Sequence, residues 1–356
     1  MFLMDLFPEY QQATDEAIEI PTPFLSHDVI DPDVTDAGEN SKHVKMDPDV
    51  SHIDNSASML SHQEEQLYDR QIRLWGVEVQ QRIMNARVLF LGKNGIQEEA
   101  IKNLVLTGMN VTLANSGIVS EADVSSSYFL QMSDIGKNVS LVHRMREMVL
   151  NKDRVKFINA CLLKECTVNG IHSYDVDDST ISSYDVISFA GGDFPLSMLV
   201  HVNEKCRQRG VAFFVSSVNG IQGFIFQDLN NHTVYLFCLE FRNIIQPKFP
   251  PNCDILIRRT VAYLLIQSMY TQTVTDPSCV LDLKYRLDEI CDAVGTNFDE
   301  VLPLFRLQGK EFAVTSGILG GYLALTIRNF VTKQYETSPS LCVFDMNRSL
   351  VTTAML

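Results

Sequence analysis

Short apolar runs alternate with helix-like stretches through the middle of the chain. Runs rich in β-branched and aromatic residues predict strands, and apolar residues three or four positions apart predict the helices between them. Strands that alternate with helices form a parallel, doubly wound sheet with right-handed crossovers, so the expected fold class is α/β with a mostly parallel sheet. The predicted strands are 88–91, 111–114, 155–159, 186–189 and 211–215, and the predicted helices are 98–107, 137–150 and 196–209.

The pattern changes after the last of these strands. An antiparallel pair is expected around the turn residues Asn230 and Asn231, and its two strands are 224–227 and 234–239. Beyond Pro250 helical spacing dominates, and the chain then returns to the main sheet. The elements predicted there are helices 258–270, 282–294, 299–307 and 311–333, followed by a strand at 341–344.

The first 60 residues follow neither a helical nor a strand period, and they carry five of the chain's twelve prolines. Such a segment buries too little apolar surface to fold, so a disordered tail is expected. Residues 61–64 fit a capping box, which predicts a helix start. Apolar residues that then predict one buried helix face are Tyr68, Ile72, Trp75 and Val79. The expected units are the tail at 1–60, an α/β domain at 61–240, a reduced helical insertion at 241–308 and a return segment at 309–356.

Charge is distributed unevenly between the tail and the rest of the chain. The 356 residues carry a formal net charge of −15, and residues 1–66 contribute 15 acidic side chains against 2 lysines. The remainder is nearly neutral, which disfavours nucleic acid as a partner because that binding depends on Lys and Arg. No apolar run approaches the roughly 20 residues of a membrane span. A soluble, intracellular protein without a membrane partner is expected.

The eight cysteines are scattered and form no C-x-x-C pair, which argues against a zinc site. Without a recognisable secretory signal, reduced and mostly buried thiols are expected rather than disulfides. The histidines show no metal-binding spacing either. No metal site is therefore expected in this chain.

The turn after the first predicted strand bears on nucleotide binding. A dinucleotide site needs G-x-G-x-x-G, whose glycines let the backbone approach the phosphates, and a later acidic residue that holds the ribose. Here only Gly92 and Gly95 fit, Gln97 replaces the third glycine, and Asn115 follows the second strand. Two glutamates after Gln97 repel an incoming phosphate. The sequence thus predicts the fold of a nucleotide-binding unit without the residues that bind the nucleotide, and it excludes an NAD-dependent dehydrogenase. The expected role of Gly92 and Gly95 is to allow close helix–sheet packing.

A segment just before this unit is far more specific. Residues 68–76 read Tyr-Asp-Arg-Gln-Ile-Arg-Leu-Trp-Gly and resemble the opening of the activating enzymes for ubiquitin and its relatives, which have a Rossmann-like, ThiF-like adenylation fold. The resemblance covers roughly residues 63–350 and implies that fold for this chain. Further segments resemble the same family in the same order, namely 102–108, 128–131, 134–138 and 317–325.

Active members of this family use three polar residues that this chain lacks. Aligned on the flanking motifs, Asn115 replaces an Asp that binds ribose, Ser126 replaces an Arg, and Val139 replaces a Lys that binds phosphate. No catalytic-cysteine motif is recognisable either. The resemblance therefore implies the smaller, non-catalytic subunit of a heterodimer, whose larger partner binds ATP, Mg and the modifier and carries the reactive cysteine. No cofactor is expected in this chain.

Two heterodimeric enzymes of this family have such a small subunit, one acting on SUMO and one on NEDD8. The length of the chain and the segment 211–227 are more similar to the SUMO type, so a regulatory subunit of a SUMO-activating enzyme is expected. The alternatives are a NEDD8-type subunit and a stand-alone ThiF-like adenylating enzyme. The resemblance implies a location in the nucleus and also in the cytoplasm, although no basic cluster of the kind carried by SUMO-type subunits is present between 241 and 258.

Arg70 is the residue expected to take part in catalysis. In this family an Arg at this position reaches across the dimer into the partner's ATP site, where a guanidinium neutralises charge on the phosphates. The structural alternative is a salt bridge with the neighbouring Asp69. Arg73, one turn further along, is expected to be structural, and Trp75 is expected to pack in the core or in a dimer interface.

Overall fold

A computed structural model describes most of the chain beyond the tail. The described residues are 60–115, 118–127, 130–137, 154–158, 163–168, 171–192, 194–230, 249, 252–273, 280–333 and 339–354. The expected tail, apart from residue 60, lies outside them, as do nearly all of the helix predicted at 137–150 and the strand predicted at 234–239.

An eight-stranded sheet forms the centre of the molecule, in the order β10-β9-β8-β7-β6-β1-β2-β3. The strands from β7 to β3 in that order run parallel, and β8, β9 and β10 continue the sheet antiparallel on the β7 side. The mostly parallel, doubly wound sheet is thus confirmed. The strands are β1 Arg87–Leu91, β2 Asn110–Ala114, β3 Val155–Ile158, β6 Val186–Ala190, β7 Ala212–Asn219, β8 Gln222–Asp228, β9 Leu341–Asp345 and β10 Leu350–Ala354.

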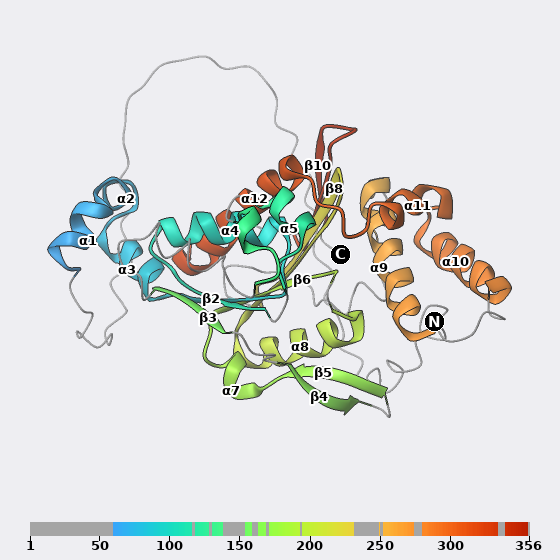
Figure 1. The fold of residues 1–356 in the computed structure, drawn as a ribbon, viewed down its shortest axis with the longest axis horizontal. Helices are drawn as coiled ribbons and strands as arrows, with labels where there is room; N and C mark the ends of the chain where they lie inside the picture. The colour runs from blue at the N-terminus through green and yellow to red at the C-terminus, as the bar shows by residue number, and fades with distance from the viewer. Residues whose placement is uncertain are drawn as a thin grey trace, which may run out of the picture.

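Helices cover both faces of this sheet (Figure 1). Successive side chains of a strand point to opposite faces, so Val88 and Phe90 pack with α4 (Gly95–Leu106) and α12 (Ala313–Thr332), whereas Leu89 and Leu91 face the other side. Strands buried on both faces consist almost entirely of apolar residues, which explains their short, unbroken runs. The helices on the second face are α8 Leu196–Arg209, α9 Ile255–Thr273, α10 Val280–Val294 and α11 Phe298–Arg306.

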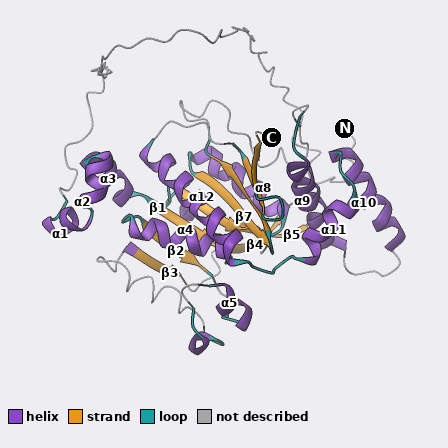
Figure 2. Ribbon diagram, turned by 90° about the horizontal axis from the view of Figure 1, so that it is seen from above, coloured by secondary structure: helices purple, strands orange, loops and turns teal. Residues whose placement is uncertain are grey.

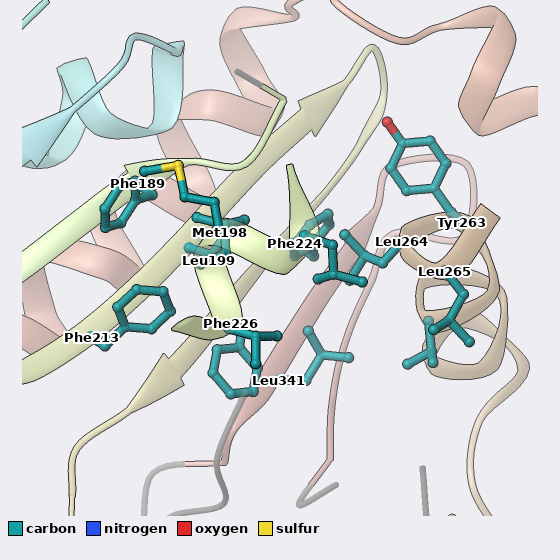
Figure 3. Packing of buried hydrophobic residues seen from close by; sticks show 14 of the residues in the cluster. Phe189, Met198, Leu199, Phe213, Phe224, Phe226, Tyr263, Leu264, Leu265 and Leu341 are labelled. Atoms are coloured by element: carbon teal, nitrogen blue, oxygen red, sulfur yellow. The ribbon is translucent and has the colours of Figure 1, made fainter. Parts of the chain in front are cut away.

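The core on this second face continues from the sheet into the C-terminal helices (Figure 3). Phe213 and Phe226 of the sheet, Met198 of α8 and Leu264 and Leu265 of α9 belong to one buried cluster. The helices after residue 250 therefore share a core with the sheet. Whether 241–308 forms a unit of its own remains a prediction.

The N-terminal helices lie at one end of the molecule and α9–α11 at the other (Figure 2). The predicted capping box is confirmed, because Ser61 and Glu64 cap α1 (His62–Leu67) reciprocally. The prediction that Tyr68, Ile72, Trp75 and Val79 form one buried helix face is wrong. The chain breaks after α2 (Asp69–Trp75) at Gly76, whose φ of 87° suits glycine, and α3 (Val77–Asn85) begins there, so only Tyr68 of the stripe is fully buried.

Two further features differ from the prediction. Strand β8 pairs with β7 on one side and β9 on the other, so the expected pair between 224–227 and 234–239 is wrong. Strand β10 follows β9 across a tight turn and was not predicted, since its residues are mostly exposed and show no buried alternation. Smaller elements are β4 Leu163–Val168, β5 Ile171–Val176, α5 Glu121–Ser126 and α7 Asp178–Ile181.

Candidate functional site

The carboxyl ends of β1 and β6 lie where the strand order of the sheet reverses. The chain leaves β1 through α4 toward β2 and leaves β6 through α8 toward β7, in the opposite direction. Open α/β sheets bind their ligands outside such a switch point. Gly92, Gly95 and Gln97 come to this place, and Asn115 stands one residue beyond the end of β2. Ser126 ends α5, and Val139 lies outside the described residues.

The Gln97 side chain donates to backbone carbonyls of β1 and β6, and a glycine at this position would have no side chain to do so. Its side chain is buried, and its Nε2 donates to the Leu91 carbonyl at 3.4 Å and to the Ser188 carbonyl at 3.2 Å. The side-chain amide therefore bridges the end of β1 and the middle of β6. A glycine at this position allows the backbone to approach a pyrophosphate, and a side chain fills that space.

Asn94 caps α4 in the place where a nucleotide-binding helix would meet its phosphate. Asn94 Oδ1 accepts a hydrogen bond from the backbone N–H of Gln97 at 2.9 Å. Asn94 Nδ2 donates to the Ser216 carbonyl at 2.7 Å. The first turn of a helix offers unpaired amides to an anion, and this cap satisfies one of them internally. We call Asn94, Gln97, Ser188 and Ser216 the switch-point cluster.

Gly95 is required by the packing of α12 against α4. A Cβ at this position would lie 2.5 Å from Ser316 Oγ and 2.9 Å from Glu311 Oε2. The expected helix–sheet role of Gly95 is thus a helix–helix contact, while Gly92 supplies a turn with a φ of 77°. The Glu311 carboxylate lies beside the first residue of α4, where its negative charge opposes a phosphate.

Glu98 adds a buried carboxyl to the same end of α4. Burial raises the pKa of Glu98 to about 7, against smaller lowering effects of Ser127 and Lys93, and the negative charges of Glu311 and Asp123 raise it further. The Lys93 ammonium is itself paired with the Asp123 carboxylate at 2.7 Å. The cation that lowers the pKa of Glu98 is therefore already paired with an acid of the same chain.

Few of these partners leave a signal in the sequence. Gln97 and the two glutamates after it depart visibly from a nucleotide motif, whereas no motif points to Asn94, Ser216 or Glu311. Ser188 interrupts the apolar strand β6, and a buried polar residue in such a strand is the one pattern that could have pointed to it.

Arg70 lies at the opposite end of α4 from the switch-point cluster. Its neighbour Gln71 donates through Nε2 to the carbonyl of Leu106, the last residue of α4, at 3.4 Å. Because a 12-residue helix is about 18 Å long, Arg70 is remote from the switch-point cluster of its own chain.

The Arg70 side chain is exposed and available to an anion. In the part of the chain that the structure describes, its guanidinium forms no hydrogen bond or ion pair. Asp69 instead accepts a hydrogen bond from Arg73 Nε at 3.0 Å, so the salt bridge considered for Arg70 is made by Arg73.

The cysteines that the structure describes in full are poor nucleophiles. Burial raises the pKa of Cys291 to about 11 and that of Cys342 to about 12, and it also raises the pKa of Cys206 and of Cys253. A thiol of this kind is almost entirely protonated at neutral pH, whereas the thiolate is the reactive form.

The described residues lack both a metal-binding cluster and a membrane-spanning helix. Nowhere among them do three or more His, Cys, Asp or Glu side chains gather in a way that could hold a metal ion. None of the described helices has both the length and the apolar character needed to span a bilayer.

Comparison with known proteins agrees with this fold. The chain is 33% identical over 172 residues to SUMO-activating enzyme subunit 1 of Dictyostelium discoideum, which covers 48% of each chain. It is 32% identical over 181 residues to the protein of that name from Xenopus laevis, a match that covers 51% of this chain and 49% of the relative. It is also 32% identical over 167 residues to DNA damage tolerance protein rad31 of Schizosaccharomyces pombe, a match that covers 47% of this chain and 50% of the relative. The chain thus spans about half the length of the relatives it matches. The sequence model of the ThiF family matches residues 68–355, which include every strand of the main sheet, and the chain belongs to the ThiF family.

Proposed function

We propose that this chain is the regulatory subunit of a heterodimeric SUMO-activating enzyme. Its larger partner binds Mg and ATP, adenylates the C-terminal carboxylate of the modifier with release of pyrophosphate, and then accepts the acyl group on a cysteine as a thioester with release of AMP. The names of the relatives, SUMO-activating enzyme subunit 1 among them, support this assignment over a NEDD8-type subunit. The same proposal places the complex in the nucleus and also in the cytoplasm.

The occupied switch point is the observation that carries this proposal. The side-chain amides of Asn94 and Gln97 occupy the place where a nucleotide-binding chain exposes its backbone to the phosphates. Glu98 and Glu311 bring acidic groups to the same end of α4. At the end of β2, where a carboxylate would hold the ribose, Asn115 is neutral. These features favour a chain that keeps the adenylation fold without binding the nucleotide.

Arg70 supplies what such a chain can still contribute to the reaction. Its guanidinium is exposed, without a partner among the described residues, and about one helix length from its own switch point. A planar guanidinium forms paired, charge-assisted hydrogen bonds with phosphate oxygens. In the heterodimer Arg70 stabilises the charge on the pyrophosphate that leaves in the partner's site.

α12 offers a surface for the catalytic subunit. Arg328 is the single charged residue of this 20-residue helix. One side packs on α4, and the other exposes Val314, Ile318 and Leu325, which recur on one face and which we call the outer face of α12. A helix that is apolar on all sides is ordinarily buried, and an exposed apolar stripe marks an interface. Leu74, which is 77% exposed and one turn beyond Arg70, extends the apolar surface of the N-terminal helices.

Two experiments test this proposal. Co-expression with the catalytic subunits of the SUMO and NEDD8 enzymes should give a stoichiometric complex with the SUMO type, and a complex with the NEDD8 type alone would show the alternative to be correct. Isothermal titration of the isolated chain with Mg-ATP should give no binding. Binding with a one-to-one stoichiometry would instead support a stand-alone adenylating enzyme.

A further inference from the structure

Both ends of α2 are fixed to the domain, and between them Arg70 is exposed while its half-buried neighbour Gln71 donates to the Leu106 carbonyl. At its start Tyr68 is buried, and its hydroxyl lies so close to Gly108 that a Cβ there would be 2.8 Å from Tyr68 Oη. At its end Trp75 is half-buried between α3 and α12. Arg70 stands between these two anchors.

Trp75 is held from two sides by polar groups. Its Nε1 donates to Gln80 Oε1 at 3.1 Å, and Gln80, which is fully buried, donates through Nε2 to the carbonyl of Thr107 at 3.0 Å. The guanidinium of Arg328 lies over the indole ring, 5.5 Å from its centre. We call Trp75, Gln80 and Arg328 the Trp75 bracket, which ties the end of α2 to α3, α4 and α12.

The bracket acts on the direction in which Arg70 points. Arg70 and Trp75 are five residues apart, or about 140° around the helix, so the guanidinium points away from the side that the bracket holds. A helix of seven residues has little stability of its own and depends on its tertiary contacts. Without the bracket, α2 could rotate or fray and Arg70 would lose its fixed direction.

We infer that the Trp75 bracket positions Arg70 for the partner's ATP site. This inference rests on the proposed function, in which Arg70 acts on the nucleotide bound by the catalytic subunit. The three bracket residues are positioning residues, since they touch α2, α3, α4 and α12 of their own chain. Because a misplacement of about 1 Å can slow a reaction up to a hundredfold, holding one short helix is enough to control the contribution of Arg70.

A double-mutant cycle in the heterodimer tests this inference. The variants are Trp75→Leu, which removes the ring and the indole donor, and Gln80→Leu, which removes both of its hydrogen bonds. Each is combined with Arg70→Ala, and modifier-dependent ATP–pyrophosphate exchange is measured at saturating ATP on complexes isolated by gel filtration. With Arg70 present, each variant should slow exchange about three- to thirtyfold. In the Arg70→Ala background the same variants should slow it less than about twofold, because the side chain they position is gone.

Conservative and control variants separate positioning from general loss of structure. Trp75→Phe keeps an aromatic ring under Arg328, and Arg328→Lys keeps the cation, so both should retain more activity than Trp75→Leu and Arg328→Met. Ile83→Val leaves a small cavity in α3 but removes no hydrogen bond or ring contact of the bracket, and exchange by this variant should match the wild type.

The possible failures are distinguishable. If Arg70→Ala alone leaves exchange unchanged, the proposed role of Arg70 fails, and the positioning role fails with it. The positioning role alone is overturned by either of two results in which Arg70→Ala slows exchange. In the first, the bracket variants exchange at the wild-type rate; in the second, they slow exchange by the same factor with and without Arg70.

Discussion

At the scale of single residues, the chain fills its own switch point. Gln97 reaches Ser188, a residue 91 positions later, and Asn94 reaches Ser216, 122 positions later. The loss of the glycine motif could be read directly from the sequence. The partners that replace it could not, because they depend on the sheet order that brings β6 and β7 beside β1.

The buried carboxyl of Glu98 makes a pH-dependent contribution to stability. Its folded-state pKa of about 7 exceeds the ordinary value of 4.5, so the folded state holds its proton more tightly than the unfolded state. Below about pH 4.5 the Glu98 carboxyl is protonated in both the folded and the unfolded state, so it does not lower the free energy of unfolding. As the pH rises to about 7 a penalty accumulates, and above that it stays constant at about 3 kcal/mol. Glu98→Gln should therefore be more stable than the wild type at pH 8, with the difference vanishing near pH 4.5.

Urea denaturation of both proteins between pH 4.5 and 8 measures this difference. Glu99→Gln is the matched control, because Glu99 lies one residue further along α4 and pairs with Lys102. That variant should not gain stability at pH 8. A Glu98→Gln difference that is constant across the range would contradict the assignment of a protonated Glu98.

At the scale of elements, the contact between α4 and α12 depends on small residues. Gly320 faces α4, where a Cβ would lie 2.5 Å from Glu99 Cβ and 2.7 Å from the Ile96 carbonyl. The adjacent Gly321 has nothing within 4 Å of the same position. Both glycines lie in the segment 317–325, which resembles the family, and only the helix orientation shows which one allows the close approach.

Replacing these two glycines should have opposite effects. Gly320→Ala should lower the free energy of unfolding by about 1–3 kcal/mol, because the Ile96 backbone cannot move away from the added methyl group. Gly321→Ala should raise it by up to about 1 kcal/mol, since Ala favours a helix interior. Thermal denaturation of the isolated chain measures both, and equal effects of the two substitutions would show that the α4–α12 contact is not as close as described.

Most of the regular elements could be predicted, and the failures share a cause. Strands and helices that bury a face, such as β6 and α8, leave a periodic pattern in the sequence, and α8 begins and ends at the predicted residues. Strand β10 is exposed over most of its length and has no such pattern. The stripe after Tyr68 looked like one helix, because the spacing of apolar residues does not register a break at a single glycine such as Gly76.

At the scale of the whole molecule, the charge and the apolar surface belong to different parts of the chain. The excess of acidic residues lies in the first 66 positions, so the net charge of −15 says little about the folded domain. The domain instead presents the outer face of α12, with Val314, Ile318 and Leu325 exposed. Obligate interfaces are large and apolar, which fits a permanent partner on this side.

A charge placed on this face should weaken the heterodimer. Ile318→Asp would bury an unpaired carboxylate in the interface, and we expect binding to the catalytic subunit to weaken by roughly tenfold or more, or about 1.4 kcal/mol. Analytical ultracentrifugation or surface plasmon resonance measures the change. Leu350→Asp, on the exposed strand β10, is the control and should bind normally. Unchanged binding of Ile318→Asp would place the partner elsewhere.

In the proposed function the chain assists a reaction in its partner through Arg70, so removing this side chain should slow that reaction. Modifier-dependent ATP–pyrophosphate exchange should be compared among heterodimers with wild-type, Arg70→Ala and Arg73→Ala regulatory subunits, after gel filtration has shown each complex to be intact. Arg70→Ala should slow exchange by roughly tenfold or more, while Arg73→Ala, which loses only an exposed pair with Asp69, should remain close to the wild type. Exchange at the wild-type rate in the Arg70→Ala heterodimer would show that Arg70 does not act in the partner's site.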